Sequence, residues 1–251
     1  MFENKVVIIT GGAGGIGSGI TKMFINEKAK VVINDLSEDK LTQFIEDTPS
    51  ESRKYLDTYK ADVRNSESID NMVAYTKNTY GSIDVLVNAA GFGLIAPSIT
   101  DISDESWELV VGVNLKGAFN TCRAVTPIMK EKGTGRIINI SSLAGRTKSV
   151  IAGAHYTSAK AGLIGLTKHL AYELIEEDNI TVNAICPGVT DTPLVRGQKT
   201  QAELDAITSG IPKGRLCTTD ELAKAVKYLA DFGNSYMTGI SLDINGGLYM
   251  N

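Results

Sequence analysis

Short apolar runs alternate along this chain with longer segments in which apolar residues recur every three or four positions. The short runs are rich in β-branched residues and predict buried strands, whereas the longer repeats predict amphipathic helices. The first unit joins a strand at 5–10, a glycine-rich turn, and a helix whose apolar face begins at Ile16. We expect further strands at 30–35, 54–60, 83–87, 136–141, 180–185 and 240–244, and intervening helices that begin near Ser37 and Ser66, extend over 103–130, and carry Tyr156 and Lys160.

This alternation of strands and helices predicts an α/β fold. A parallel sheet of about seven strands with helices on both faces would give three layers in the Rossmann-type doubly wound arrangement. No proline- or serine-rich linker divides the chain, so we expect a single domain over 1–251. The segment 188–217 is rich in Pro, Gly and Thr around a weak helix at 201–208, and its place near the carboxyl edge of the sheet predicts a substrate lid.

Composition and charge exclude several classes of protein. With 43% hydrophobic and 22% charged residues the chain is typical of a globular protein, and its net charge of −4 offers no basic surface for nucleic acid. Three cysteines and two histidines show no metal-binding spacing, so we expect no metal site. We find no long uncharged apolar run and no leader-like segment before the first strand, and therefore expect no membrane association and a cytoplasmic location.

A glycine cluster, Thr-Gly-Gly-Ala-Gly-Gly-Ile-Gly at 10–17, occupies the first strand-to-helix turn. Glycines there allow a tight turn and close approach of a pyrophosphate to the helix N-terminus, so their position predicts dinucleotide binding. Asp35 ends the second strand, where a carboxylate can accept hydrogen bonds from the adenosine ribose and would repel a 2′-phosphate. We therefore expect NAD rather than NADP, with the alternative that Asp35 is only a helix-capping carboxylate.

Tyr156 and Lys160 are four residues apart in a segment of helical periodicity, which places both side chains on one face. A phenol titrates near pH ~10 in water, and a nearby cation favours phenolate and lowers that pKa. Such a pair can move a proton on and off an alcohol oxygen. Because chance often supplies a tyrosine and a lysine at this spacing, the significance of the pair depends on the motifs around it.

Together with the glycine turn and Asp35, this pair resembles the short-chain dehydrogenase/reductase family, and the resemblance extends over nearly the whole chain. Further motifs of the family are matched at 62–63, 88–91, 113–115, 139–142, 187–192 and 243–247, with alanine at position 89 as a mild departure. The resemblance implies a nicotinamide dinucleotide bound by Gly11, Gly15, Ile16, Gly17, Asp35, Leu36, Asp62, Val63, Asn88, Ala90, Tyr156, Lys160, Pro187, Gly188, Thr190 and Thr192.

The resemblance also implies an oxidoreductase that transfers hydride between the nicotinamide and a secondary alcohol or ketone. In that mechanism Tyr156 exchanges the proton of the substrate oxygen, and Lys160 lowers the phenol pKa and binds the nicotinamide ribose. Ser142 orients the substrate oxygen, and Asn114 holds a water that links Lys160 to solvent. Ser142 lies 14 residues before Tyr156, one more than the family spacing, so Ser141 is a second candidate.

Three interpretations of function are open. The family includes 3-oxoacyl-[acyl-carrier-protein] reductases, but an acidic carrier needs a basic docking face, and the run Glu-Glu-Asp at 176–178 would repel it. That run and Asp35 favour an NAD-linked alcohol, polyol or diol dehydrogenase, although such a run is also typical of a solvated helix end. A dinucleotide-binding sensor without activity is the third interpretation, which the complete set of four predicted catalytic residues disfavours.

A mostly apolar substrate pocket is expected beside Tyr156, and the family resemblance implies a homotetramer. His155 could hydrogen-bond a substrate hydroxyl, but we favour a histidine packed beside the site for structural reasons. The predicted pocket residues are Phe92, Leu94, Val150, Ile151, His155 and Val195.

Overall fold

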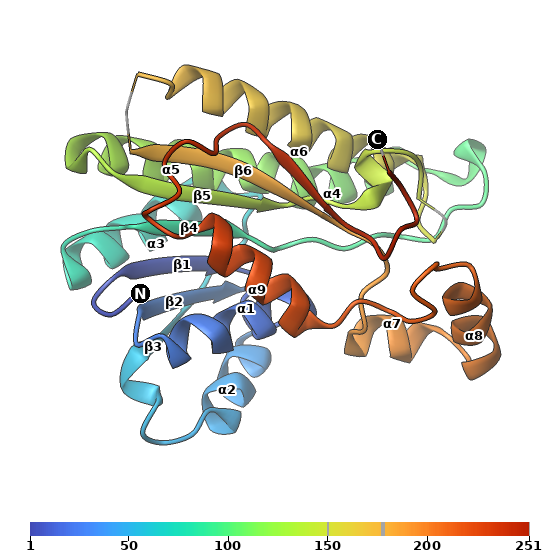
Figure 1. Ribbon diagram of the computed structural model, residues 1–251, viewed down its shortest axis with the longest axis horizontal. Coiled ribbons are helices and arrows are strands. Elements are labelled where there is room, and N and C mark those ends of the chain that lie inside the picture. The colour runs from blue at the N-terminus through green and yellow to red at the C-terminus, as the bar shows by residue number, and fades with distance from the viewer. Residues whose placement is uncertain (150, 177–178, 251) are drawn as a thin grey trace.

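The computed structural model describes residues 1–149, 151–176 and 179–250, with a seven-stranded sheet at its centre (Figure 1). The strands are ordered β3-β2-β1-β4-β5-β6-β7, and all neighbouring pairs are parallel. The strand order reverses between β1 and β4, and open α/β sheets bind ligands beyond the carboxyl ends of their strands at such a point. The strands are β1 (Val6–Thr10), β2 (Lys30–Asp35), β3 (Leu56–Lys60), β4 (Val85–Asn88), β5 (Gly135–Ile140), β6 (Ile180–Pro187) and β7 (Ser241–Ile244).

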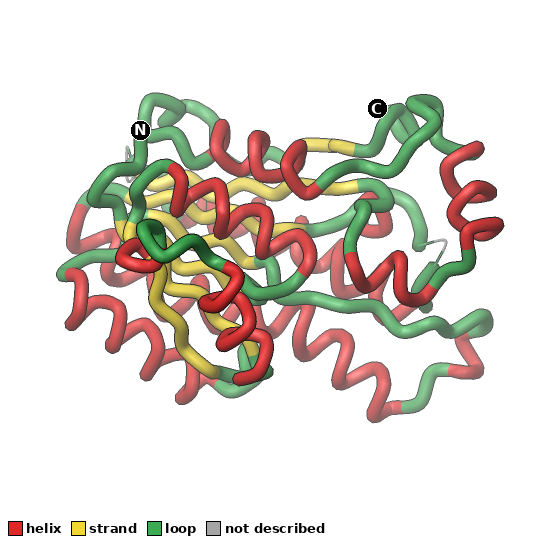
Figure 2. The backbone as a smooth tube through the Cα atoms, turned by 90° about the horizontal axis from the view of Figure 1, so that it is seen from below, coloured by secondary structure: helices red, strands yellow, loops and turns green. Residues whose placement is uncertain are grey.

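Helices cover both faces of this sheet and give three layers (Figure 2). One face shares a core with α1, α2 and α9, through side chains such as Ile20 and Val226. The other face shares a core with α3, α5 and α6, through side chains such as Met72 and Val125. The helices are α1 (Gly15–Asn26), α2 (Glu38–Asp47), α3 (Ser66–Tyr80), α4 (Asp104–Val111), α5 (Gly117–Lys132), α6 (Ala154–Glu173), α7 (Pro193–Gln198), α8 (Gln201–Ser209) and α9 (Thr219–Leu229).

The predicted fold class is confirmed, and the structure differs locally from the sequence expectation. Residues Arg53–Tyr55 form a 3₁₀ turn, so the strand expected at 54–60 begins at Leu56. The helix expected at 103–130 contains a π-helical segment, Gly112–Lys116, between α4 and α5. The Asn114 side-chain amide donates to the carbonyl of Val110 at 2.9 Å and so competes with the backbone for an acceptor at this widened turn.

The segment predicted as a lid contains two short helices. Thr192 caps α7 by accepting a hydrogen bond from the Val195 N–H, and Thr200 begins α8 in a reciprocal capping box with Glu203. The segment also has a small hydrophobic core, formed by Leu204, Ile211 and Leu216. Opening and closing of this segment over the cavity stays a prediction.

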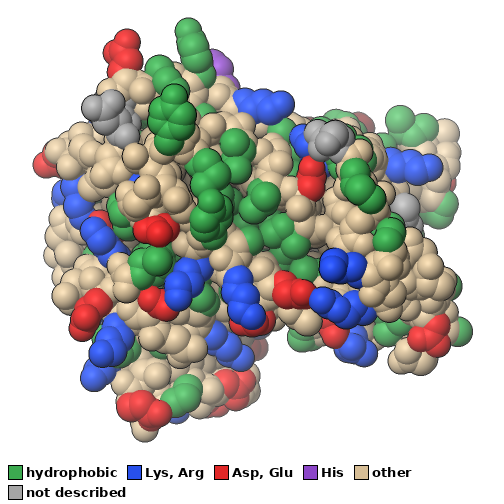
Figure 3. Space-filling model, viewed as in Figure 1, with side chains coloured by type: hydrophobic (Ala, Val, Ile, Leu, Met, Phe, Trp, Pro, Cys, Tyr) green, Lys and Arg blue, Asp and Glu red, His purple; other side chains and the backbone are tan. Residues whose placement is uncertain are grey.

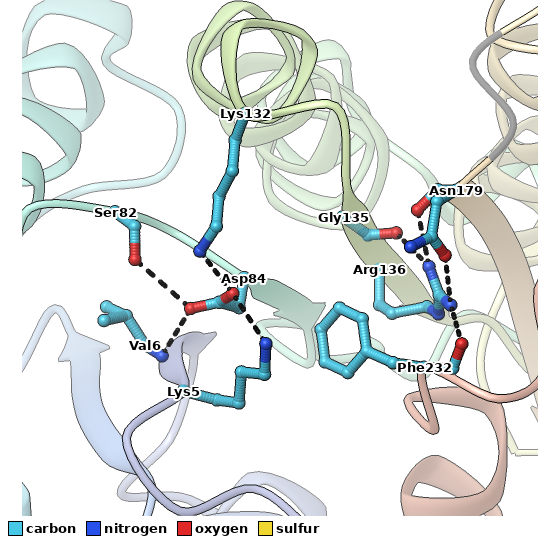
Figure 4. A network of polar contacts seen from close by, with 9 residues as sticks. All are labelled: Lys5, Val6, Ser82, Asp84, Lys132, Gly135, Arg136, Asn179 and Phe232. Atoms are coloured by element: carbon cyan, nitrogen blue, oxygen red, sulfur yellow. Dashed lines mark hydrogen bonds and ion pairs between the residues drawn. The ribbon is translucent and has the colours of Figure 1, made fainter.

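The amino edge of the sheet, opposite the glycine turn, is held by two buried charges (Figure 4). Asp84 accepts hydrogen bonds from the N–H of Val6 at 2.9 Å and from Lys132 at 2.6 Å. Arg136 is fully buried, and its guanidinium lies 4.6 Å from the centroid of the Phe232 ring. It donates hydrogen bonds to the carbonyl oxygens of Gly135, Asn179, Asp231 and Phe232. These contacts fix the starts of β1, β4 and β5 at the end of the sheet remote from the predicted ligand edge.

Candidate active site

A cavity of about 1100 Å³ opens along the carboxyl edge of the sheet, across the point where the strand order reverses. This volume exceeds the roughly 300–1000 Å³ typical of a small-molecule pocket, so the cavity has room for a cofactor together with a substrate. Its wall follows the turns after successive strands and includes most residues predicted to bind the cofactor: Gly11, Gly15, Ile16, Gly17, Asp35, Leu36, Asp62, Val63, Ala90, Tyr156, Pro187, Gly188, Thr190 and Thr192.

The glycine turn leaves bare backbone where the first helix begins. Gly11 has a φ of +64°, and a Cβ on Gly17 would lie 2.1 Å from the Gly11 carbonyl oxygen. A Cβ on Gly15, the first residue of α1, would lie 2.9 Å from the side chain of Thr192. The first turn of α1 contains no acidic residue, so its N–H groups favour an anion. The residues present therefore fit a dinucleotide whose pyrophosphate would be bound at this helix.

The end of the cavity after β2 and β3 contains two carboxylates, Asp35 and Asp62. The Asp35 carboxylate accepts a hydrogen bond from the N–H of Ser37 at 3.1 Å. Asp62 binds the Arg64 guanidinium, with the shortest contact at 2.6 Å, and this hydrogen bond holds the pKa of Asp62 below its ordinary value. Lys40 also lines this end and is a cation that the sequence analysis did not consider.

The side chain of Asn88, which the family resemblance assigned to the cofactor, lies behind the cavity wall. Asn88 is 4% exposed, and its amide donates to Asn139 Oδ1 at 2.8 Å. Its side-chain oxygen, Oδ1, accepts a hydrogen bond from the Thr121 hydroxyl at 2.6 Å. These bonds tie β4 to β5 and α5, so this side chain supports the turn that carries Ala90 rather than lining the cavity.

Tyr156 lies in the cavity wall near the start of α6, and Lys160 Nζ lies 5.7 Å from the centroid of its ring. Lys160 is 4% exposed and donates to the carbonyl of Ile140 at 2.8 Å. Burial lowers the pKa of Lys160 to about 8. Burial also raises the pKa of Tyr156, opposite to the direction expected from the sequence, because desolvation of the phenolate outweighs the hydrogen bond from Ser142 that favours it.

The two serines after β5 have different partners. Ser141 is 3% exposed, and its hydroxyl donates to the carbonyl of Lys160 at 2.8 Å, which holds α6 against the sheet. The Ser142 hydroxyl accepts a hydrogen bond from the N–H of Ala144 at 3.1 Å, and Ser142 and Tyr156 both line the cavity. Because the Ser141 hydroxyl is bonded to the Lys160 carbonyl and the interaction of Ser142 with Tyr156 favours the phenolate, Ser142 is the better candidate for the serine that meets a substrate oxygen.

Asn114 places an unpaired acceptor in the same region. Its amide donates to the carbonyls of Phe92 at 2.8 Å and Val110 at 2.9 Å, while its Oδ1 is buried and has no partner among the described residues. A Cβ on Gly91 would lie 2.6 Å from that oxygen and 3.1 Å from Lys160 Nζ, so both atoms face the same glycine. A buried acceptor beside a buried ammonium suits a water or a ribose hydroxyl.

The predicted substrate residues divide into two groups. Those in the cavity wall are Phe92, Ile151 and Val195. Leu94 and His155 do not line the cavity, and His155 is 1% exposed with its Nδ1 accepting the N–H of Tyr156 at 3.0 Å. Val150 lies outside the described residues. The wall also contains residues that the sequence analysis missed: Leu109, Val113, Lys148, Leu194, Gln198 and Leu248.

Residues 1–149, 151–176 and 179–250 contain no group of three His, Cys, Asp or Glu side chains that could hold a metal ion. None of the helices in these ranges is both long and apolar enough to cross a membrane. The three cysteines, Cys122, Cys186 and Cys217, are free thiols.

Comparison with known proteins gives consistent matches over nearly the whole chain. Residues 11–249 match the family described as Enoyl-(Acyl carrier protein) reductase. The chain is 38% identical to 3-oxoacyl-[acyl-carrier-protein] reductase FabG of Thermotoga maritima, over 98% of each chain. It is 37% identical to acetoacetyl-CoA reductase of an Acinetobacter species over 100% of both chains, and 34% identical to D-beta-hydroxybutyrate dehydrogenase of Rhizobium meliloti over 97% of this chain and 98% of that one. Among solved structures, it resembles the crystal structure of gox2181 with a TM-score of 0.92, 33% identity, and coverage of 98% of this chain and 96% of that chain.

Proposed function

The chain belongs to the short-chain dehydrogenase/reductase family, and we propose that it is an NAD(H)-dependent oxidoreductase that interconverts the 3-hydroxy and 3-oxo groups of acyl substrates. The observation that carries the chemistry is the position of the Ser142 and Tyr156 side chains in the wall of one cavity that begins at the glycine turn. Hydroxyls can both donate and accept, which suits a substrate oxygen that changes between alcohol and ketone.

The names of the relatives favour an acyl substrate. 3-Oxoacyl-[acyl-carrier-protein], acetoacetyl-CoA and β-hydroxybutyrate all carry the reacting oxygen on the carbon β to the acyl carbon. This shared feature supports a 3-oxoacyl-type carbonyl reductase, the alternative of the sequence analysis, better than the alcohol, polyol or diol dehydrogenase that the sequence favoured.

The charges of the cavity are compatible with an anionic acyl substrate. Among the described lining residues the carboxylates are Asp35 and Asp62, both at the end after β2 and β3. The exposed Lys148 lies between Thr147 and Ser149 in the loop that precedes α6, and all three line the cavity. A carboxylate or a phosphate on the substrate would gain from this cation, whereas a neutral alcohol would not.

We favour free acids and coenzyme A thioesters over an acyl carrier protein as the form of the substrate. Cations and anions are interspersed on the face seen in Figure 3, so that face has no broad basic field for an acidic carrier. Glu176, the described member of the acidic run 176–178, is exposed beyond the end of α6, and the other two lie outside the described residues.

The residues of the cavity divide the proposed reaction between them. A bound nicotinamide supplies or accepts the hydride at the substrate carbon. Tyr156 donates its phenol proton to the ketone oxygen during reduction and takes it back during oxidation. Ser142 hydrogen-bonds the same oxygen and orients it beside the phenol. Lys160 and Asn114, which both face Gly91, hold a ribose hydroxyl or a water through which a proton returns to Tyr156.

Asp35 supports NAD(H) as the cofactor, because a carboxylate at the end of β2 accepts from ribose hydroxyls and repels a 2′-phosphate. Lys40 at the same end of the cavity would attract that phosphate and so opposes the effect of Asp35. Asp35→Ala should raise the KM for NADH much more than the KM for NADPH, and Lys40→Ala should raise mainly the KM for NADPH. Equal changes for both cofactors in Asp35→Ala would contradict the assignment.

The substrate class is tested by initial rates of NADH loss with acetoacetyl-CoA, acetoacetate, ethyl acetoacetate, and a simple ketone, and by NADH formation with diols and polyols. We expect higher kcat/KM for the β-oxo compounds. Tyr156→Phe should abolish turnover while NADH still binds, as measured by its fluorescence. A higher kcat/KM for diols or polyols would contradict the acyl-substrate proposal and favour the alcohol, polyol or diol dehydrogenase. Substantial turnover in Tyr156→Phe would contradict the mechanism.

A homotetramer is proposed as the assembly. Large apolar side chains are exposed on the helices of one face, with Trp107 on α4 38% exposed, Phe119 on α5 43% exposed and Tyr172 on α6 76% exposed. Exposed aromatic side chains on neighbouring helices support burial between copies of the chain. Sedimentation equilibrium measures the assembly, and a monomer at micromolar concentration would contradict it.

A further inference from the structure

The turn that follows β5 links the Ser142 hydroxyl to an ion pair. Ser142 caps this 3₁₀ turn, and its carbonyl accepts the N–H of Gly145 at 3.0 Å. Arg146 ends the turn, where its N–H donates to the carbonyl of Leu143 at 2.9 Å. A single hydrogen-bonded turn of backbone therefore separates the Ser142 hydroxyl from the side chain of Arg146.

The Arg146 side chain is bound to the last strand of the sheet. Its Nη2 donates to Asp243 Oδ2 at 3.0 Å, and the two side chains are only 16% and 18% exposed. The register of β6 and β7 places Asp243 opposite Cys186, and the N–H of Ser141 donates to the carbonyl of the preceding residue, Ile185, at 2.8 Å. The ion pair, the end of β6 and the serine turn therefore meet at one place.

The segment after β7 packs over the same ion pair. Asn245 Oδ1 accepts the N–H of Gly247 at 3.0 Å and of Tyr249 at 3.3 Å, and its amide donates to the carbonyl of Tyr249 at 3.1 Å. This loop places the Tyr249 ring 5.6 Å from the Arg146 guanidinium and Leu248 in the cavity wall. The ion pair thus connects two parts of that wall, the turn of the catalytic serine and the segment that carries Leu248.

The hydrogen bonding of this ion pair is incomplete, which argues against a role in stability alone. Arg146 Nε and Asp243 Oδ1 are buried and lack hydrogen-bond partners among the described residues. Taking two charges out of water costs several kcal/mol unless their donors and acceptors are satisfied, so such a pair is weak evidence for stabilisation. We therefore assign this ion pair a different role, which is to hold the turn in a fixed position relative to the last strand.

We propose that Arg146 is a positioning residue whose ion pair with Asp243 fixes the turn 142–146, so that the Ser142 hydroxyl keeps its place beside Tyr156 in the cavity wall. The inference rests on the proposed function, in which both hydroxyls contact the substrate oxygen. A residue that acts through Ser142 loses its influence once that hydroxyl is removed, whereas a contribution to general stability does not.

A double-mutant cycle tests this dependence with acetoacetyl-CoA as the substrate. Ser142→Ala should lower kcat by about 10²–10³, the effect of losing one oxygen-stabilising donor. Arg146→Ala should lower kcat by about tenfold while the KM for NADH changes less than about twofold, because it loosens that donor without removing it. In the Ser142→Ala background, Arg146→Ala should change kcat by less than about twofold. Losses that multiply in the double variant would overturn the inference.

Two conservative variants cover the case in which Arg146→Ala does not fold. Arg146→Lys keeps a cation near Asp243 and should recover most of the activity, whereas Asp243→Asn keeps the shape without the charge and should behave like Arg146→Ala. Lys77→Ala is the matched control, since it removes the cation of the more exposed Lys77–Glu131 pair and should leave kcat unchanged. Full activity in Asp243→Asn would also overturn the inference.

A readout without turnover separates this inference from the proposed function. In protein carrying ring-¹³C tyrosine, the Tyr156 signal is assigned by its absence from Tyr156→Phe. It should move in Arg146→Ala in the same direction as in Ser142→Ala and stay in place in Lys77→Ala. An unmoved signal in Arg146→Ala overturns the inference whatever the activity. A moved signal in a protein that reduces no 3-oxoacyl compound supports the inference and overturns the proposed function.

Discussion

Replacement of Asp84 by Asn tests the buried charge cluster at the amino edge of the sheet (Figure 4). Asp84 is 1% exposed, and its carboxylate accepts from the N–H of Val6 at 2.9 Å and from Lys132 at 2.6 Å, with Lys5 at 3.5 Å. Burial alone would raise the pKa of this carboxyl, but the hydrogen bonds from Lys132 and Val6 outweigh burial and hold its pKa below the ordinary value. Asparagine keeps the shape of the side chain and removes its charge.

The size of the effect follows from the exposure of the partners. Removing one partner of a fully buried ion pair costs about 3–5 kcal/mol, because the other charge is left uncompensated. The side chains of Lys5 and Lys132 are each 33% exposed and can return to water. We therefore expect only the loss of the charge-assisted hydrogen bonds, about 2–3 kcal/mol of unfolding free energy at pH 7. The matched control is Glu131→Gln, whose carboxylate is 73% exposed and should contribute less than about 1 kcal/mol.

The pH dependence has a definite sign. Because the folded pKa of Asp84 lies below the unfolded value of about 3.9, its stabilisation is present above that value and is lost as pH falls through the folded pKa. Urea unfolding followed by circular dichroism, at equal protein concentrations, should give a constant gap between wild type and Asp84→Asn from pH 7 to 5. The gap should begin to close below pH 4. A gap of less than about 1 kcal/mol at pH 7, or one that widens on acidification, would refute this reasoning.

Three further outcomes are expected. Gly17→Ala should weaken NADH binding by at least about tenfold in a fluorescence titration, because its Cβ would lie 2.1 Å from the Gly11 carbonyl oxygen. The control is Gly165→Ala in α6, which should leave binding intact because no atom lies within 4 Å of its Cβ. Lys148→Ala should raise the KM for acetoacetate by about fivefold and leave that for ethyl acetoacetate unchanged, as one exposed ion pair contributes up to about 1 kcal/mol; equal changes would contradict an anion contact. Arg136→Met should lower the unfolding free energy by about 3 kcal/mol or more in urea, because it leaves buried carbonyl oxygens without donors.

The fold could be predicted from the sequence where local pattern and tertiary structure agree. The β-branched runs at β1, β2 and β5 are buried on both faces, so their composition alone indicates strands. The end of β6 could not be predicted, because Pro187 belongs to the strand through its pairing with Ile244 of β7. The π-helical segment could not be predicted either. Its hydrogen bond from Asn114 to Val110 leaves the apolar periodicity of the sequence nearly unchanged.

The candidate site was predictable where a motif fixes both the backbone and the side chain. The glycine turn, Ser142 and Tyr156 lie together in one cavity wall because each follows a strand or begins a helix at the same edge of the sheet. A motif did not predict the role of the Asn88 side chain, which hydrogen-bonds Asn139 and Thr121 and does not line the cavity. Lys148 was missed because a loop residue carries no periodicity. Leu109 and Val113 did carry a signal, since they stand four residues apart on the helix that leads to Asn114.

The sign of the pKa shifts in the Tyr156–Lys160 pair decides how reduction should depend on pH. Tyr156 keeps its proton at pH 7 because burial raises its pKa, and the protonated phenol is the form that ketone reduction consumes. Lys160, with a pKa of about 8, is mostly charged at pH 7 and loses its charge above pH 8. Loss of the ammonium leaves the developing phenolate without a neighbouring cation, so kcat/KM for acetoacetyl-CoA reduction should fall as pH rises through about 8. In Lys160→Arg, whose cation keeps its proton throughout, the residual activity should lack this decline. The same decline in both proteins would assign it to another group and refute the role of Lys160.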